Sequence, residues 1–143
     1  MDWGDNTAIG AAVEASLCAD PDIEFVVAFG SRFTGTPTAG SDIDITIKFA
    51  PGLSDSERFD KQCFLSGDLQ RDGAPFVDIS DIERLPVEVA YDASIDGTFV
   101  CGDKRAFERF TEDIEASFRE QRDERQRADR ALIDRIATEG LRG

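Results

Sequence analysis

The sequence predicts a small α+β domain in which a mixed sheet is flanked by helices. The chain has 143 residues, 41% of them are hydrophobic, and short β-prone runs alternate with stretches of helical period. A chain of this length suits one domain and can bury a real core. We therefore expect a single domain over residues 1–143, with its core at about 8–120 and a charged C-terminal helix at about 103–139.

The first part of the chain indicates a helix followed by two strands. Ile9, Val13 and Leu17 recur at helical spacing and form one face of the first helix. Residues 23–29 (IEFVVAF) are almost all apolar and β-prone, which indicates a buried strand. Residues 42–47 (DIDITI) alternate strictly, so three isoleucines share one strand face while two aspartates and a threonine share the other.

The middle of the chain indicates a helix and two further short strands. Residues 54–57 (SDSE) can cap a helix, and we expect this helix to bury three residues. These are Phe59, Cys63 and Phe64. Residues 75–79 and 98–101 are typical of strands, with a helical or irregular segment around 86–91 between them. The expected order is α-β-β-α-β-(α)-β-α.

One long helix, beginning at Asp103 or Lys104, is predicted for the C-terminal part. Its first turns carry an aromatic and aliphatic stripe made of Phe107, Phe110, Ile114 and Phe118. Residues 103–135 hold ten acids and nine bases, which favours a solvated, salt-bridged helix over a nucleic-acid-binding stripe. Leu132, Ile133 and Ile136 then form a small apolar patch. The patch could pack on the core or dock on a partner helix, and we expect the core.

The charge balance excludes several classes of function. There are 30 acidic and 16 basic residues, which gives a net charge of −14, and there is no histidine. An imidazole base and a histidine-ligated metal are therefore excluded, and the anionic surface argues against direct binding of nucleic acid. Only three of the bases are lysines, and this acid-rich, lysine-poor composition is what a protein from a salt-rich cytoplasm would show.

Cysteine usage and hydropathy bear on the cellular location. Cys18, Cys63 and Cys101 are odd in number and lack C-x-x-C spacing, so we expect reduced or buried thiols rather than a disulfide or a zinc site. No apolar run approaches the roughly 20 residues of a membrane helix. The N-terminus is acidic, unlike the basic start of a signal peptide. We expect a cytoplasmic protein that does not enter a membrane.

Three carboxylates form the candidate site. Asp42 and Asp44 leave the same strand face about 6.6 Å apart along the backbone, and Asp78 comes from a neighbouring predicted strand. Adjacent carboxylates repel unless a cation lies between them, and hard oxygen ligands favour Mg²⁺ or Mn²⁺. Gly30 and Ser31, after the first strand, can offer a phosphate close backbone approach and a hydroxyl. The simpler interpretation is the solvent face of an amphipathic strand.

The spacing of these residues resembles a known motif. Gly30-Ser31, ten residues, then Asp42-x-Asp44 is similar to the motif of the DNA polymerase β-like nucleotidyltransferase superfamily. The longer string FGSRFTGTPTAGSDIDITI looks like the minimal nucleotidyltransferases (MNT), and residues 76–82 (FVDISDI) look like the family's third-carboxylate strand. That likeness places the third carboxylate at Asp78 rather than Asp81.

The resemblance implies an activity and roles for the site. It implies transfer of AMP from ATP, with Mg²⁺ or Mn²⁺ held by Asp42, Asp44 and Asp78. Gly30 and Ser31 would hold the triphosphate, and Arg32 could contact a phosphate. The chain has no room for a second, acceptor-binding domain. In MNT proteins the usual partner is a HEPN-domain toxin, so the resemblance implies an antitoxin that adenylylates a toxin tyrosine within a hetero-oligomer.

Two alternatives stay open at this point. The chain could be an antitoxin that neutralises a HEPN ribonuclease mainly by binding. It could also transfer nucleotides to a small molecule or an RNA presented by a separate acceptor-binding subunit. An RNA acceptor would have to approach an acidic surface unless that subunit supplied positive charge.

Overall fold

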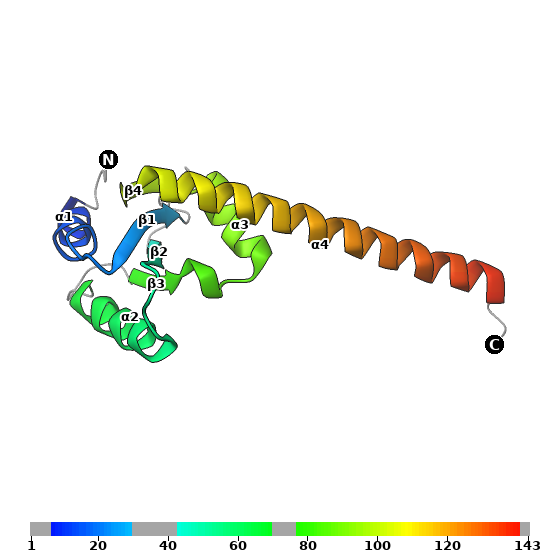
Figure 1. Cartoon of the computed structure of the whole chain (residues 1–143), viewed down its shortest axis with the longest axis horizontal. Coiled ribbons are helices and arrows are strands. Elements are labelled where there is room, and N and C mark those ends of the chain that lie inside the picture. Colours follow the sequence, from blue (N-terminus) through cyan, green and yellow to red (C-terminus); the bar gives the residue numbers. More distant parts are fainter. Residues whose placement is uncertain (1–6, 30–42, 70–76, 141–143) are drawn as a thin grey trace.

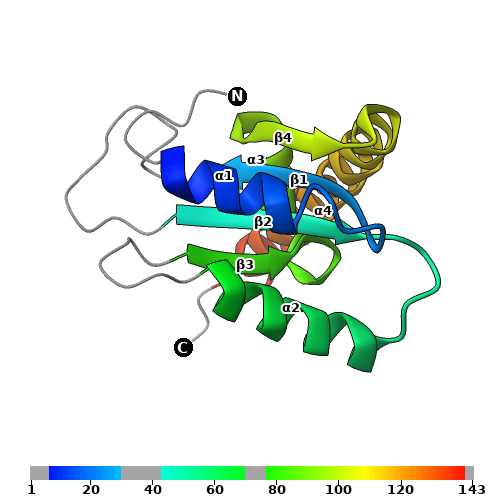
Figure 2. The same cartoon turned by 90° about the vertical axis from the view of Figure 1, so that its left-hand side faces the viewer.

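The computed structural model describes residues 7–29, 43–69 and 77–140, and these form a four-stranded mixed sheet with helices on both faces (Figures 1 and 2). The elements in chain order are α1 (Thr7–Ser16), β1 (Ile23–Phe29), β2 (Ile43–Phe49), α2 (Asp55–Leu69), β3 (Val77–Asp81), the 3₁₀ turn η2 (Ile82–Arg84), α3 (Val87–Asp96), β4 (Thr98–Gly102) and α4 (Lys104–Glu139). The α+β class and the expected order are confirmed, and the segment around 86–91 is part of the α-helix α3.

The sheet order β3-β2-β1-β4 places the two central strands in the middle of the core. Strand β1 runs antiparallel to both β2 and β4, whereas β2 and β3 are parallel. A parallel pair needs a crossover, and α2 supplies it. As a result, the end of β1 lies beside the beginnings of β2 and β3.

Each face of the sheet has its own buried cluster. Helices α1 and α2 cover one face, where the alternating residues Ile43, Ile45 and Ile47 are fully buried. Helices α3 and α4 cover the other face over Phe25 and Val27. The strand alternation is confirmed, but the second face is no solvent face along most of its length. Buried Thr46 lies on it and its hydroxyl donates to the Val27 carbonyl oxygen at 3.3 Å.

Helix α2 begins as expected but turns a different side to the sheet. The Glu57 N–H donates to Ser54 Oγ, and the Ser54 N–H donates to Glu57 Oε1, both at 3.1 Å, which is a capping box. Phe59 and Phe64 are 62% and 71% exposed, and Cys63 is exposed, so their predicted burial is wrong.

The inward side of α2 combines apolar and charged residues, which explains the error. Leu65 and Leu69 are buried. On the same side the Lys61 ammonium pairs with the Asp20 carboxylate at 2.8 Å, and the Gln62 amide donates to the Ile79 carbonyl oxygen at 2.8 Å. Polar contacts therefore help to attach this side of α2 to the sheet. The positions of the aromatic residues in the sequence could not predict it.

Helix α4 packs on the body only along its first half. Asp103 caps it by accepting hydrogen bonds from the Arg105 and Ala106 N–H groups. Phe107 contacts Phe25 edge to face, and Phe118 stacks on Tyr91 with ring centroids 4.2 Å apart. The helix then continues beyond α3, as Figure 1 shows.

The last apolar patch of α4 does not reach the core. Leu132, Ile133 and Ile136 are 48%, 64% and 48% exposed, so the expected packing on the core is wrong. The reason is that α3 is much shorter than α4, which has 36 residues. Helix α3 has ten residues, and its first turn already meets α4 through the ion pair of Glu88 with Arg125 at 2.7 Å.

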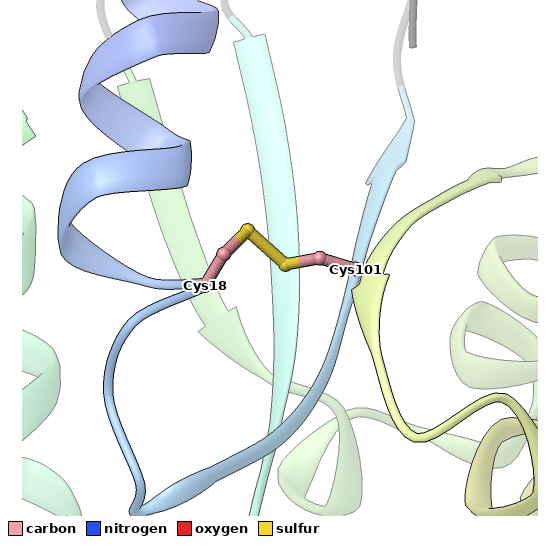
Figure 3. The surroundings of a disulfide bond; sticks show 2 residues. All are labelled: Cys18 and Cys101. Carbon is pink, nitrogen blue, oxygen red and sulfur yellow. A yellow bond between two sulfur atoms is a disulfide. The ribbon is translucent and has the colours of Figure 1, made fainter.

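A disulfide joins Cys18, just after α1, to Cys101 in β4 (Figure 3). This corrects the expectation of reduced thiols. The two cysteines are 83 residues apart in sequence, and the fold brings them together because β4 pairs with β1 and Cys101 packs on the cluster that contains Val13 and Leu17. The described residues contain no helix that is long and apolar enough to span a bilayer.

Candidate active site

The candidate site lies at the end of the sheet where β1 finishes and β2 and β3 begin. In the strand register Phe29 pairs with Asp44, and Asp44 pairs in turn with Asp78. The three residues form one row across three adjacent strands. Because strands in a sheet are about 4.8 Å apart, the backbones of the two aspartates are direct neighbours.

Asp44 and Asp78 also share a face of the sheet. Their neighbours Ile43, Ile45 and Ile79 are buried on the α1–α2 side, so the two aspartates belong to the α3–α4 side. Asp78 is exposed and Asp44 is half-buried. The fold thus brings together two carboxylates that are 34 positions apart in sequence, at a place that solvent reaches.

The other predicted site residues lie outside the described part of the chain. These are Gly30, Ser31, Arg32 and Asp42. In sequence Gly30 follows Phe29, the last residue of β1, and Asp42 precedes Ile43, the first residue of β2. The roles of these four residues stay predictions.

Asp81, at the other end of β3, has a different environment. Its carboxylate is 1% exposed and lies 3.5 Å from the Arg58 guanidinium and 3.7 Å from that of Arg84. It also accepts a hydrogen bond from the Glu83 N–H at 3.0 Å and so caps η2. A buried, ion-paired carboxylate of this kind holds the chain in place, and it is turned away from solvent.

The four basic residues of the described body before α4 are committed elsewhere. Lys48, Arg58, Lys61 and Arg84 pair with acidic residues on α2, at the start of β1 and around η2. Asp44 and Asp78 occupy paired positions on adjacent strands. Two carboxylates held this close repel each other, and such a pair favours a bound cation.

The donor set fits a hard divalent cation. Carboxylate oxygens from adjacent strands are the ligands that Mg²⁺ and Mn²⁺ prefer, and the chain has no histidine to favour a softer metal. Within residues 7–29, 43–69 and 77–140 no group of three His, Cys, Asp or Glu residues is placed to hold a metal. The described part therefore contains two of the three predicted ligands, and the third, Asp42, lies beyond it.

A groove that no sequence pattern indicated lies between α3 and α4. Its volume is about 340 Å³, and its lining residues are Glu88, Asp92, Phe118, Gln121, Arg122 and Arg125. The helical stripe up to Phe118 indicated contact with another element. The groove itself depends on where α3 ends, which no sequence spacing reveals.

The family match covers the candidate site. The model of the family described as "Polymerase beta, Nucleotidyltransferase" matches residues 13–106, about two thirds of the chain. This chain belongs to the polymerase β nucleotidyltransferase family. No curated protein matches the sequence.

Solved structures with the same fold come from toxin–antitoxin systems. A toxin–antitoxin structure with AMP-PNP matches with a TM-score of 0.65 and 22% identity over 94% of this chain and 99% of that chain. The toxin–antitoxin MntA-HepT matches with a TM-score of 0.58 and 21% identity over 93% and 97%. A tri-AMPylated Shewanella oneidensis HEPN toxin in complex with MNT antitoxin matches with a TM-score of 0.58 and 20% identity over 93% and 96%. At these identities the likeness is one of fold.

Proposed function

We propose that this chain is an MNT-type antitoxin that transfers AMP from ATP to a hydroxyl of a HEPN toxin. The observation that carries the proposal is the pairing of Asp44 with Asp78 on one exposed end of a nucleotidyltransferase sheet. The fold neighbours support the choice of acceptor, since one of those structures contains an AMPylated HEPN toxin with its MNT antitoxin.

The proposed step is an in-line substitution at phosphorus. The acceptor oxygen bonds to the α-phosphorus of ATP, the bond from that phosphorus to the bridging oxygen breaks, and pyrophosphate leaves. Exposed Asp78 accepts the hydroxyl proton. Gly30, Ser31 and Arg32 hold the triphosphate.

The carboxylates of Asp42, Asp44 and Asp78 would hold Mg²⁺ or Mn²⁺. When bound, such an ion lowers the charge repulsion between ATP and this acidic chain and stabilises the departing pyrophosphate. Asp44 and Asp78 occupy paired positions on two adjacent strands, so they would set where such an ion lies.

The fold neighbours also support a protein acceptor. The matches span 93–94% of this chain and 96–99% of each neighbour, and those structures come from toxin–antitoxin systems. A cytoplasmic location follows from this proposal, because ATP is the donor. Adaptation to high salt stays a prediction from composition.

Transfer of label tests the proposal. The full chain is incubated with ATP labelled on its α-phosphate, Mg²⁺ and the protein encoded beside it, which the proposal expects to be a HEPN protein. We expect label on a side-chain hydroxyl of the HEPN protein, and we expect EDTA to abolish both the transfer and ATP binding. Label on RNA or on an aminoglycoside instead would contradict the proposed acceptor. Undiminished ATP binding in EDTA would contradict the assigned site.

A further inference from the structure

We propose that the groove between α3 and α4, together with the outer half of α4, is the docking surface for a helix of the HEPN partner. This inference rests on the proposed function and names the surface through which the acceptor is held. We call the outer residues on one side of α4 the α4 stripe. It consists of Gln121, Arg125, Ala128, Leu132 and Ile136.

The outer half of α4 meets α3 only at its beginning, where Arg125 pairs with Glu88 and Gln121 lines the groove, within the part of the chain that the structure describes. Every residue from Gln121 onward is exposed, and from Gln126 to Glu139 the helix continues for about 21 Å beyond its last ion pair with α3. Helices in proteins gain most of their stability from packing an apolar face on another element. The projecting segment carries the exposed apolar residues Leu132 and Ile136. We therefore infer that this apolar face packs on a partner molecule.

The α4 stripe continues the side of the helix that already packs. Ile114 and Phe118 contact the body, and the spacing of three and four residues carries the same side on through Arg125 to Leu132 and Ile136. The groove of about 340 Å³ shares Phe118, Gln121 and Arg125 with this side. Groove and stripe are thus one continuous surface with the period that an entering helix matches.

This surface is on the same side of the sheet as the candidate active site. Figure 2 shows α1 and α2 in front of the sheet and α4 behind it, and Figure 1 shows α4 extending away from that rear face. Asp44 and Asp78 lie on the α3–α4 side as well. A protein seated along α4 would therefore stand on the side from which an acceptor hydroxyl reaches the two carboxylates.

Charge selects the kind of occupant. Residues 1–102 hold 19 acids and six bases, whereas Gln121–Glu139 holds five of each. This balanced segment of α4 repels no partner, and the acidic body attracts one with a cationic surface. A second copy would bring another chain of charge −14 against the first, and a nucleic acid would meet the same repulsion. A helical protein with a basic surface fits best.

Paired substitutions test the surface without changing charge. The stripe variant carries Leu132→Gln and Ile136→Gln. The control variant carries Ala131→Gln and Ala137→Gln, which lie on the same helix away from the α4 stripe. Both keep good helix formers on an exposed segment, and circular dichroism checks their helicity. Binding to the purified HEPN protein is measured by calorimetry, and the KM and kcat for AMP transfer are measured separately.

We expect the stripe variant to bind about tenfold or more weakly, with a higher KM and an unchanged kcat, while the control variant matches the wild type. Hydrogen exchange on the wild-type chain should slow across Gln121–Glu139 when the HEPN protein is added. Equal affinity and KM in both variants, or unchanged exchange, would overturn the docking surface and leave the proposed transfer intact.

Two further outcomes separate this inference from the proposed function. Stripe-dependent binding without AMP transfer would support the docking surface and contradict the proposed chemistry. A dimer of the chain alone that the stripe variant disperses, seen by sedimentation, would assign the α4 stripe to a second copy and overturn the inference.

Discussion

The two ends of the sheet hold carboxylates in opposite ways. At the end of β3 the buried Asp81 lies among Arg58 and Arg84, and the nearby Lys61 pairs with Asp20 and Asp22. At the start of β2 and β3, Asp44 and Asp78 are paired with each other across the strands, and Asp78 is exposed. The comparison teaches that position within one short strand separates a structural acid from a candidate catalytic one.

The largest expected effect comes from Asp44. We expect Asp44→Asn to lower the rate of AMP transfer by about 10²- to 10⁴-fold, since it removes a ligand charge and a positioned carboxylate. The exposed Asp60→Asn on α2 is the matched control and should keep the wild-type rate. If Asp44→Asn, alone or with Asp42→Asn, still neutralises the HEPN toxin, binding and not chemistry is the mode of neutralisation.

The opposite end should respond in stability. Asp81→Ala removes the buried partner of the Arg58 guanidinium, which is 17% exposed and keeps only the more exposed Glu83 carboxylate at 3.3 Å. We expect the free energy of unfolding to fall by about 3–5 kcal/mol, measured by urea denaturation. The rate of AMP transfer per folded molecule should not change. A variant as stable as the wild type would show that the ion pairs around Asp81 contribute nothing to the fold.

The disulfide should contribute somewhat less. Closing a loop between residues 83 positions apart stabilises by constraining the unfolded chain, typically by about 2–4 kcal/mol. Replacing Cys18 and Cys101 by serine should lower the unfolding free energy by that amount, while replacing exposed Cys63 by serine should change it little. Thiol titration of the native protein should find one reactive thiol. Three would contradict the bridge.

The smallest expected effect concerns pH. Hydrogen bonds from the Lys61 ammonium to Asp20, and then to Asp22, raise the pKa of Lys61 above the ordinary 10.5. The stabilisation by these pairs is fully present below that ordinary value and is lost as pH rises through the raised pKa. Lys61→Met should therefore lose this alkaline component of the pH dependence, compared with wild type by urea denaturation at a series of pH values. An identical pH dependence would contradict the pairing.

Local periodicity predicted much of the fold. The alternation of Ile43, Ile45 and Ile47 and the stripe from Phe107 to Phe118 report directly which side is buried, because one element imposes one period. The capping box was predictable because its two partners, Ser54 and Glu57, lie only three positions apart. What failed depends on contacts between distant segments. The burial of α2 residues, the bridge of Cys18 with Cys101, and the free end of α4 all follow from where a second element begins or ends.

The candidate site divides in the same way. The alternation along residues 42–47 predicted the face of the strand on which Asp44 lies. Asp78 was chosen over Asp81 from the family motif and not from any periodicity. Their pairing required the parallel register of β2 and β3. The ion pairs of Asp81 could not be predicted, because Arg58 is brought to it by a crossover helix 23 positions earlier in the chain.

The most direct test of the account is the rate of AMP transfer by Asp78→Asn beside that of Asp81→Asn. Both variants exchange a carboxylate for an amide on the same five-residue strand. Rates are measured with α-labelled ATP, Mg²⁺ and the HEPN protein, and each is divided by the folded fraction. We predict that Asp78→Asn loses transfer and keeps wild-type stability, whereas Asp81→Asn loses stability and keeps transfer. Transfer that survives in Asp78→Asn would contradict the assignment of the active site.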